Sequence, residues 1–209
     1  ERLETYVPLF EGQSDVLDVG CGRGEFLDLL RSAGINGRGV DLNQAMVEET
    51  RARGFDATCT DALGYLRELP DASLGGLFAA QVVEHLQPDY LAALLEVAAQ
   101  KLRPGGRVVL ETINPSCWVA FFESYLRDLT HVRPLHLETL QYLMRASGFS
   151  DLQLRFSSPV APEHRLQPAD VPTGADPDLA DKDPRVNENI DRLNSRMFSY
   201  QDYAAIATR

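Results

Sequence analysis

The chain of 209 residues has the length of one α/β domain rather than two, and we expect a single domain over 1–209. Hydrophobic residues make up 44% and charged residues 24%, a balance typical of a globular protein with a substantial core. The formal net charge of −11 argues against a broad phosphate-binding surface, so nucleic acid is not expected as a partner. No apolar run approaches the roughly 20 residues of a membrane-spanning helix, so no membrane span is expected either.

The three cysteines, Cys21, Cys59 and Cys117, are far apart in the sequence and form no CxxC pair. This pattern favours reduced thiols and predicts a cytoplasmic protein. The sequence begins with Glu1 rather than Met, so we expect it to be one domain of a longer protein.

Strands and helices alternate through most of the chain. The expected strands are 15–19, a second that ends at 40–42, 55–60, 75–82, 106–112, 151–156 and the final SYQDYAAIATR. The expected helices run from Phe26 to Gly34, from Asn43 to Gly54, and over 62–68, 89–102 and 137–147. This alternation predicts an α/β fold: a Rossmann-like, doubly wound, mostly parallel sheet of seven strands with helices on both faces. We expect the final strand at the edge of this sheet.

Two segments interrupt the alternation. Residues 114–135 are expected to form a cap inserted after the fifth strand. Its aromatic residues at helical spacing are Trp118, Phe121, Phe122 and Tyr125. Such a stripe either packs in the core or offers aromatic faces to a sugar or another flat acceptor. Residues 157–195 hold six of the 12 prolines and many acids, which predicts a long loop or lid.

A glycine-rich turn follows the first strand. Its residues are Asp18-Val19-Gly20-Cys21-Gly22-Arg23-Gly24. Such a turn lets a ligand approach the main chain, and the helix that follows offers N–H donors. Nicotinamide enzymes have GxGxxG at this place, whereas this chain has DxGxGxG followed directly by Glu25. A carboxylate there would repel a pyrophosphate but suits a ligand that carries positive charge.

Two acids follow at the ends of the next strands. Asp41 ends the second strand, where an acid can accept hydrogen bonds from both ribose hydroxyls. Asp61, followed by Ala62, ends the third strand, where it can accept from an exocyclic amine or cap the next helix. With LRPGGRVVLET at 102–112, these features resemble the class I S-adenosylmethionine (SAM) methyltransferases over residues 14–156.

The resemblance implies a role for each matching residue. The glycine-rich turn would lie against the methionine and ribose of SAM, Asp41 and Leu42 against the ribose and adenine, and Asp61 against the adenine amine. The implied cofactor-binding residues are Asp18, Gly20, Cys21, Gly22, Gly24, Asp41, Leu42, Asp61, Ala62, Gln81 and Val82.

The chemistry is expected in QVVEHLQP (81–88) and in LRDLTHVRPLH. If residues 81–85 form a helical turn, then Gln81, Glu84 and His85 share one face. Both stretches resemble the O-methyltransferases of ubiquinone biosynthesis and the small-RNA 2′-O-methyltransferases, which have E-x-x-E-H and a downstream histidine. This resemblance implies Glu84, His85 and His131 as catalytic residues and as the ligands of a divalent metal, if there is one.

Some alternatives stay open at this site. Glutamine stands at position 81 where those families have glutamate, and the loss of one carboxylate weakens a site for a hard cation. The alternative is a metal-free site with His131 as general base, oriented by Glu84 or Asp128. His85 is equally well explained as a residue that supports its loop. His136 is better explained as the start of a helix.

The whole sequence most resembles bacterial methyltransferase domains of O-antigen and other surface-polysaccharide assembly. The stretches that carry this resemblance are LDVGCGRGEFLDLLR, QVVEHLQPDYL, THVRPLHLETLQYLMRASGF and NSRMFSYQDYAAIA. It implies O-methylation of a sugar hydroxyl and a fused or associated glycosyltransferase. Three alternatives remain: a quinone precursor or another small molecule as acceptor, a nicotinamide oxidoreductase, and a non-catalytic SAM-binding scaffold.

Overall fold

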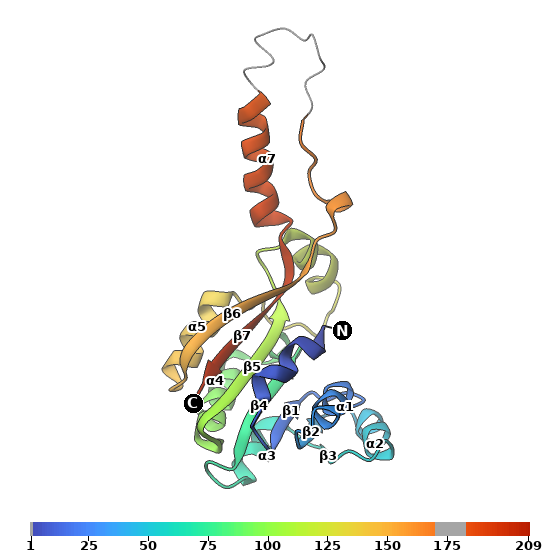
Figure 1. The fold of residues 1–209 in the computed structure, drawn as a ribbon, viewed down its shortest axis with the longest axis vertical. Coiled ribbons are helices and arrows are strands. Elements are labelled where there is room, and N and C mark those ends of the chain that lie inside the picture. The colour runs from blue at the N-terminus through green and yellow to red at the C-terminus, as the bar shows by residue number, and fades with distance from the viewer. Residues whose placement is uncertain (1, 170–182) are drawn as a thin grey trace.

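A seven-stranded sheet in the order β3-β2-β1-β4-β5-β7-β6 forms the centre of the molecule (Figure 1). The computed structural model describes residues 2–169 and 183–209. The strands are β1 (Val16–Val19), β2 (Gly37–Asp41), β3 (Ala57–Cys59), β4 (Leu74–Ala80), β5 (Leu102–Ile113), β6 (Ser150–Pro159) and β7 (Tyr200–Thr208). The first five strands pair in parallel, and β7 is antiparallel to both β5 and β6. The predicted fold class is confirmed.

Helices cover both faces of the sheet. These helices are η1 (Leu3–Phe10), α1 (Glu25–Ser32), α2 (Gln44–Ala52), α3 (Ala62–Glu68), α4 (Pro88–Lys101) and α5 (Leu137–Ala146). A further helix, α7 (Asp183–Met197), does not lie on the sheet. Short helical turns add η2 (Val83–His85), η3 (Ala120–Tyr125) and η4 (Pro162–His164). Side chains of η1, α1 and α2 pack on one face of the sheet, and side chains of α3, α4 and α5 pack on the other. Apolar burial on both faces stabilises the doubly wound arrangement.

Local capping explains where the helices near the site begin. The side chain of Asn43 accepts from the N–H groups of Ala45 and Met46, so it caps α2 as predicted. Asp61 caps α3 by accepting from Gly64 N at 2.7 Å. Each cap lies two residues after the end of a strand. Asp41 and Asp61 are therefore held at the carboxyl edge of the sheet, where ligands of such sheets bind.

The last strand is in a different place from the one predicted. β7 lies between β5 and β6, and β6 is the edge strand. Residues 202–207 of β7 are all buried. Tyr203 and Ala205 face the α3–α5 side and Ala204 faces the η1 side. A strand buried on both faces fits an inner position, whereas an edge strand would leave its hydrogen-bonding groups open on one side.

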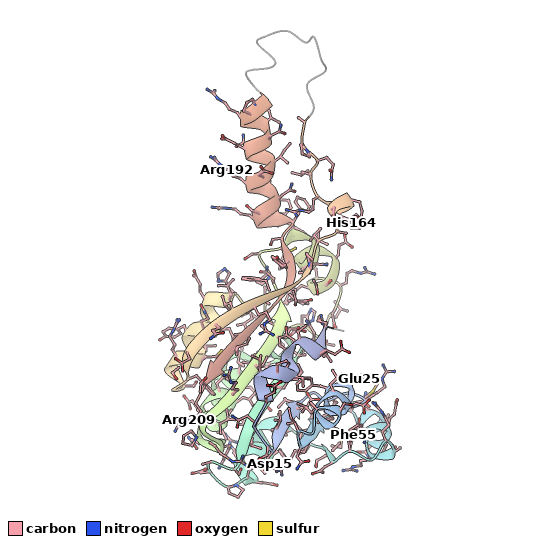
Figure 2. All side chains as sticks on the ribbon, viewed as in Figure 1. Asp15, Glu25, Phe55, His164, Arg192 and Arg209 are labelled. Atoms are coloured by element: carbon pink, nitrogen blue, oxygen red, sulfur yellow. The ribbon has the colours of Figure 1, made fainter. Side chains whose placement is uncertain are left out.

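The predicted loop over 157–195 is wrong at its two ends, whereas residues 165–169 form neither helix nor strand. β6 runs on to Pro159, η4 follows, and α7 occupies residues 183–197. Figure 1 shows α7 extending away from the sheet, and Arg192, three-quarters exposed, projects from it in Figure 2. The part of this prediction that falls on 170–182 lies outside the described residues. No helix in the described ranges has the length and apolarity to cross a membrane.

The segment 114–135, called the cap segment below, contains the expected helical turn η3. Its aromatic stripe divides between the two interpretations. Tyr125 is buried with Cys117 and Ala120 in a small separate core. Trp118 and Phe122 leave about half of their surface exposed. Core packing therefore explains Tyr125 but not Trp118.

Candidate active site

A cavity of about 540 Å³ opens at the carboxyl ends of β1, β2, β3 and β4. We call it the cofactor cavity. The residues predicted for the cofactor that line it are Gly20, Asp41, Leu42, Asp61, Ala62, Gln81 and Val82. Residues at the ends of four strands, far apart in the sequence, thus line one cavity.

The glycine loop forms one wall of the cofactor cavity. Gly20 has φ +71°, and a Cβ built on it would lie 2.5 Å from Val82 Cγ2. Glycine is therefore required twice, for the left-handed conformation and for the contact with Val82. The loop is also tied to β2, because Gly22 N donates to Asp41 Oδ2 at 2.9 Å.

Asp41 is held firmly at the end of β2. Besides the bond from Gly22, its Oδ1 accepts from Asn43 N at 2.8 Å. Each carboxylate oxygen keeps a further lone pair that a ligand hydroxyl can use. Leu42 beside it is 77% exposed, so an apolar side chain lies open at the cavity wall.

Asp61 caps α3 and also lines the cofactor cavity, so the capping role is confirmed and leaves the side chain within reach of a ligand. Its Oδ1 accepts from the hydroxyl of Tyr90 in α4, which in turn accepts from Leu63 N at 2.9 Å. Burial, and then the hydrogen bond to Asp61, raises the pKa of Tyr90 to about 12. Tyr90 lines the cavity and was missed by sequence reasoning; its position one turn before Leu94, which also lines the cavity, is the only local signal.

A smaller hollow of about 180 Å³ adjoins the cofactor cavity, with which it shares Gly20 and Ala80. It is lined by Asp18, Cys21, Gly22 and Glu25, and also by Arg2 from the N-terminal segment. Asp18 is buried, and burial together with the charges of Asp41 and Glu25 raises its pKa well above the ordinary value. Two carboxylates, Asp18 and Glu25, line the hollow, and the charge of Asp41 acts on Asp18 from the neighbouring cavity; this arrangement favours a ligand that brings positive charge. Arg2 was not predicted, because nothing in the sequence near it indicates a site.

Two residues of the glycine-rich turn are packed into the protein. A Cβ on Gly39 would lie 2.5 Å from Cys21 Sγ, so the Cys21 thiol is wedged against β2. Burial raises its pKa to about 12, which leaves the thiol unreactive. Gly24 is absent from the lining of both hollows in the described structure; it begins α1 with φ +79° and lies against Thr50.

Glu84, His85 and His131 come together beside the cofactor cavity. One ligand atom from each lies within 4.8 Å of the others, and His85 lines the cavity. Glu84 is buried, and its Oε2 accepts from Thr112 Oγ1 at 2.9 Å. Its Oε1 is buried without a hydrogen-bond partner among the described residues, and burial raises the pKa of the carboxyl. A buried carboxylate oxygen left open in this way fits a cation or a donor from a ligand.

The hydrogen bonds of the two histidines define their tautomers. His131 Nδ1 lies 2.8 Å from the carbonyl oxygen of Tyr125, so Nδ1 carries the proton. The Thr130 hydroxyl donates to Asp128 at 2.6 Å and therefore accepts from His85 Nδ1 at 2.9 Å. In the neutral form of each ring the lone pair is then on Nε2, and the two ring centroids are 4.6 Å apart. Neutral Nε2 atoms serve as metal ligands or as a general base.

Gln81 does not join this cluster. The helical turn covers only Val83–His85, and Gln81, at φ +56°, donates from Nε2 to Asp202 Oδ1 at 3.1 Å. The expectation that Gln81 shares a face with Glu84 and His85 is therefore wrong. His136 accepts from Glu138 N and caps α5, as predicted.

Comparison with known proteins identifies the family. Residues 1–154 match the model of a family described as methyltransferase domain. A probable S-adenosylmethionine-dependent methyltransferase of Mycolicibacterium smegmatis is 33% identical over 139 residues, covering 65% of this chain and 51% of that protein. A ubiquinone biosynthesis O-methyltransferase of Xylella fastidiosa is 31% identical over 132 residues, covering 61% of this chain and 52% of that protein. The chain thus spans about half the length of the curated relatives it matches.

A solved structure agrees over the whole length. The SAM-dependent methyltransferase of Archaeoglobus fulgidus is 37% identical with a TM-score of 0.90, and the match covers 100% of this chain and 91% of that one. Because the family model covers well over half of the chain, the chain belongs to the methyltransferase domain family, and its methyl donor is S-adenosylmethionine.

Proposed function

We propose that the chain is an O-methyltransferase that transfers the methyl group of SAM to a hydroxyl of a sugar. The observation that carries this proposal is the cluster of Glu84, His85 and His131 at the edge of the cofactor cavity. A sugar hydroxyl is a weak nucleophile until a base or a cation takes up its proton. Methyl transfer to a nitrogen whose lone pair is already free would need no such cluster.

In this proposal SAM occupies both the cofactor cavity and the smaller hollow. Asp41 binds the ribose hydroxyls and Asp61 the adenine amine, both from the cofactor cavity. Asp18 and the Gly20–Gly22 loop hold the methionine part from the smaller hollow. SAM supplies the electrophilic methyl group. The chain positions the acceptor oxygen against it.

The same cluster is proposed to hold a divalent cation. Glu84 Oε1 and the Nε2 atoms of His85 and His131 are its ligands, a set of two imidazoles and one carboxylate. Such a cation, when bound, lowers the pKa of the acceptor hydroxyl. Its competitor is a metal-free site in which His131 Nε2 accepts the proton while Tyr125 O holds Nδ1. The effect of a chelator separates the two.

A third hollow, of about 350 Å³, supports a sugar as the acceptor. It shares Gln81 with the cofactor cavity and Arg2 with the smaller hollow. Its other polar lining comes from Ser124, Ser158, Gln201 and Asp202. Hydroxyl, amide and carboxylate groups in one hollow suit a ligand that carries several hydroxyls.

The biological setting is proposed from the sequence resemblance. It comprises a bacterial surface polysaccharide as acceptor, a fused or associated glycosyltransferase, and a cytoplasmic location. The three cysteines are all unpaired, which supports a reducing compartment.

A quinone precursor is the second candidate acceptor. The observation that favours it is the similarity to ubiquinone biosynthesis O-methyltransferases, at 31% identity over 132 residues. A catechol is also more acidic than a sugar hydroxyl, so it depends less on a strong base. The two acceptors are therefore tested side by side.

The test measures transfer of labelled methyl from SAM to three acceptor classes, with and without EDTA. The classes are bacterial surface oligosaccharides, a catechol quinone precursor and short RNA. Label in an oligosaccharide, lost on adding EDTA and restored by a divalent cation, supports the full proposal. Label only in the catechol overturns the sugar assignment, and label that survives EDTA overturns the cation. No label in any acceptor, with SAM bound, would indicate a scaffold.

A further inference from the structure

A fourth hollow, of about 600 Å³, lies apart from the sites described above. It forms where the start of the cap segment, the C-terminal end of α7 and the outer ends of β6 and β7 come together (Figure 1). It shares no lining residue with the cofactor cavity. We call it the outer cavity. Two of its walls, the cap segment and α7, are additions to the seven-stranded sheet, so the sheet itself does not require this hollow.

Three aromatic side chains line the outer cavity and stay open to solvent. Trp118 is 51% exposed, Phe156 41% and Tyr200 44%. Phe156 and Tyr200 stand on the paired strands β6 and β7 with their ring centroids 5.9 Å apart. Large rings gathered half-exposed around one hollow are unusual for a surface without a ligand. Such rings offer flat apolar faces for the C–H face of a sugar ring to stack on.

Polar groups stand between the rings. Asn114 joins two walls of the cavity by donating to Tyr200 O at 2.9 Å and accepting from Ser116 N at 3.1 Å. The lining also includes the hydroxyls of Ser116 and Ser199 and the guanidinium of Arg196. Arg196 forms no ion pair with any described residue, so its donors are open to a ligand. Aromatic faces beside hydroxyl and guanidinium groups match the two kinds of surface of a sugar: its C–H faces and its hydroxyl rim.

The cap segment connects this cavity to the catalytic cluster. Its first part supplies Ser116 and Trp118 to the outer cavity. Its later part supplies Tyr125, whose ring stacks on His131 with centroids 4.6 Å apart. One continuous segment therefore contacts both places.

We infer that the outer cavity is a second acceptor subsite, which binds sugar units of an oligosaccharide other than the unit that is methylated. This inference rests on the proposed sugar specificity and extends it from a single sugar to a chain. The outer cavity then supplies affinity for long acceptors, while the catalytic cluster acts on the terminal hydroxyl. A monosaccharide bound at the catalytic cluster does not reach the outer cavity.

The chain provides its own reporter for the test, because Trp118 is its only tryptophan. Oligosaccharides that bind on an array of bacterial surface glycans are titrated against the wild-type protein while the Trp118 fluorescence is followed. The expected result is a saturable change with the oligosaccharide and none with S-adenosylhomocysteine, which binds elsewhere. Failure of every glycan on the array to change the fluorescence overturns the inference.

Variants separate this inference from the proposed function. Tyr200→Ala and Phe156→Ala are each expected to weaken oligosaccharide binding and raise KM for the oligosaccharide about tenfold, with kcat and S-adenosylhomocysteine affinity unchanged. The matched control is Tyr142→Ala, since Tyr142 is 69% exposed on α5 and does not line the cavity. Binding that depends on Tyr200 but no methyl transfer supports the subsite and contradicts the proposed function. Methyl transfer to the oligosaccharide with an unchanged KM in both variants overturns the subsite alone.

Discussion

The two halves of the sheet form their sites in different ways. The half that contains β1–β4 uses the main chain: glycine φ angles, helix caps and carboxylates that accept from N–H groups close in sequence. Gly22 and Asp41 are 19 residues apart, and Asp61 and Gly64 only three. The half that contains β5–β7 uses side chains from distant segments. Asp202 of β7 accepts from Gln81, 121 residues away after the end of β4, and from Arg2, 200 residues away.

This difference corresponds to what each half has to recognise. The methyl donor is always the same molecule, so a wall of fixed main-chain groups suits it. An acceptor differs from one methyltransferase to another, and side chains on added segments can change without disturbing the sheet. We therefore expect substitutions in the first half to act on SAM affinity and those in the second half to act on turnover or on acceptor affinity.

The largest effect is expected in the second half, from His131→Ala. It removes the Nε2 lone pair that accepts the proton or binds the cation, so kcat should fall by about 10²–10⁴-fold. Affinity for S-adenosylhomocysteine, measured by calorimetry, should stay unchanged because His131 does not line the cofactor cavity. The control is His164→Ala, a histidine of the exposed turn η4. Full activity of His131→Ala would indicate that this cluster takes no part in the reaction.

The second effect belongs to the first half, through Gly20→Ala. A left-handed alanine is strained by about 1–2 kcal/mol, and its Cβ would lie 2.5 Å from Val82 Cγ2. The loop must move, so affinity for S-adenosylhomocysteine should fall by roughly 10–100-fold. Gly34→Ala is the matched control, because Gly34 has φ +73° with nothing within 4 Å of its Cβ. The control should lose stability but keep its affinity. Equal affinities in the two variants would contradict a cofactor role for the Gly20 loop.

The same division explains what the sequence predicts. The glycine loop, the Asn43 cap and the Asp61 cap each depend on residues a few positions away, so local patterns reveal them. The partners of Arg2 and Asp202 lie across the whole chain, and no local pattern indicates such a pair. Sequence reasoning missed these residues for that reason.

For two wrong predictions, the sequence does contain a pattern that favours the observed structure. The final strand is apolar on both faces, which favours an inner strand over the predicted edge position. In α7, Val186, Ile190, Leu193 and Met197 follow helical spacing, but the prolines and acids of 157–195 dominated the prediction of a loop. Local composition is a weaker guide than periodicity when the two disagree.

Asp18→Asn tests the charge of the smaller hollow. Burial, and then the charges of Asp41 and Glu25, raise the pKa of Asp18 in the folded state, so protonation of Asp18 stabilises the folded state. This stability is fully present below about pH 3.8, the ordinary pKa, and is lost as the pH rises through the raised pKa. The variant should therefore have a free energy of unfolding higher by about 1 kcal/mol at pH 8, with the gain shrinking toward low pH.

The same variant should bind SAM about tenfold more weakly, with a smaller loss for S-adenosylhomocysteine, which lacks the sulfonium charge. Thermal unfolding at several pH values and calorimetry with both ligands measure the two effects. The control is Glu49→Gln, an exposed acid of α2 that lines neither hollow in the described structure. A lower stability of Asp18→Asn at pH 8 would contradict the interpretation that the smaller hollow is suited to a positively charged ligand.

The smallest effect is expected from Tyr90→Phe, which tests whether the two halves of the sheet differ in function as proposed. Tyr90 belongs to the first half, yet it acts through a side chain 29 residues from Asp61, in the manner of the second half. Its hydroxyl donates to Asp61 and accepts from Leu63 N, so its loss frees the Asp61 carboxylate to shift while the bond from Gly64 keeps the cap. We expect S-adenosylhomocysteine to bind about fivefold more weakly, the cost of roughly 1 kcal/mol for one hydrogen bond, with kcat unchanged. Tyr142→Phe on exposed α5 should change neither quantity. A loss of turnover without a loss of affinity would contradict a binding role for Tyr90, because weaker SAM binding no longer changes the rate once SAM is saturating.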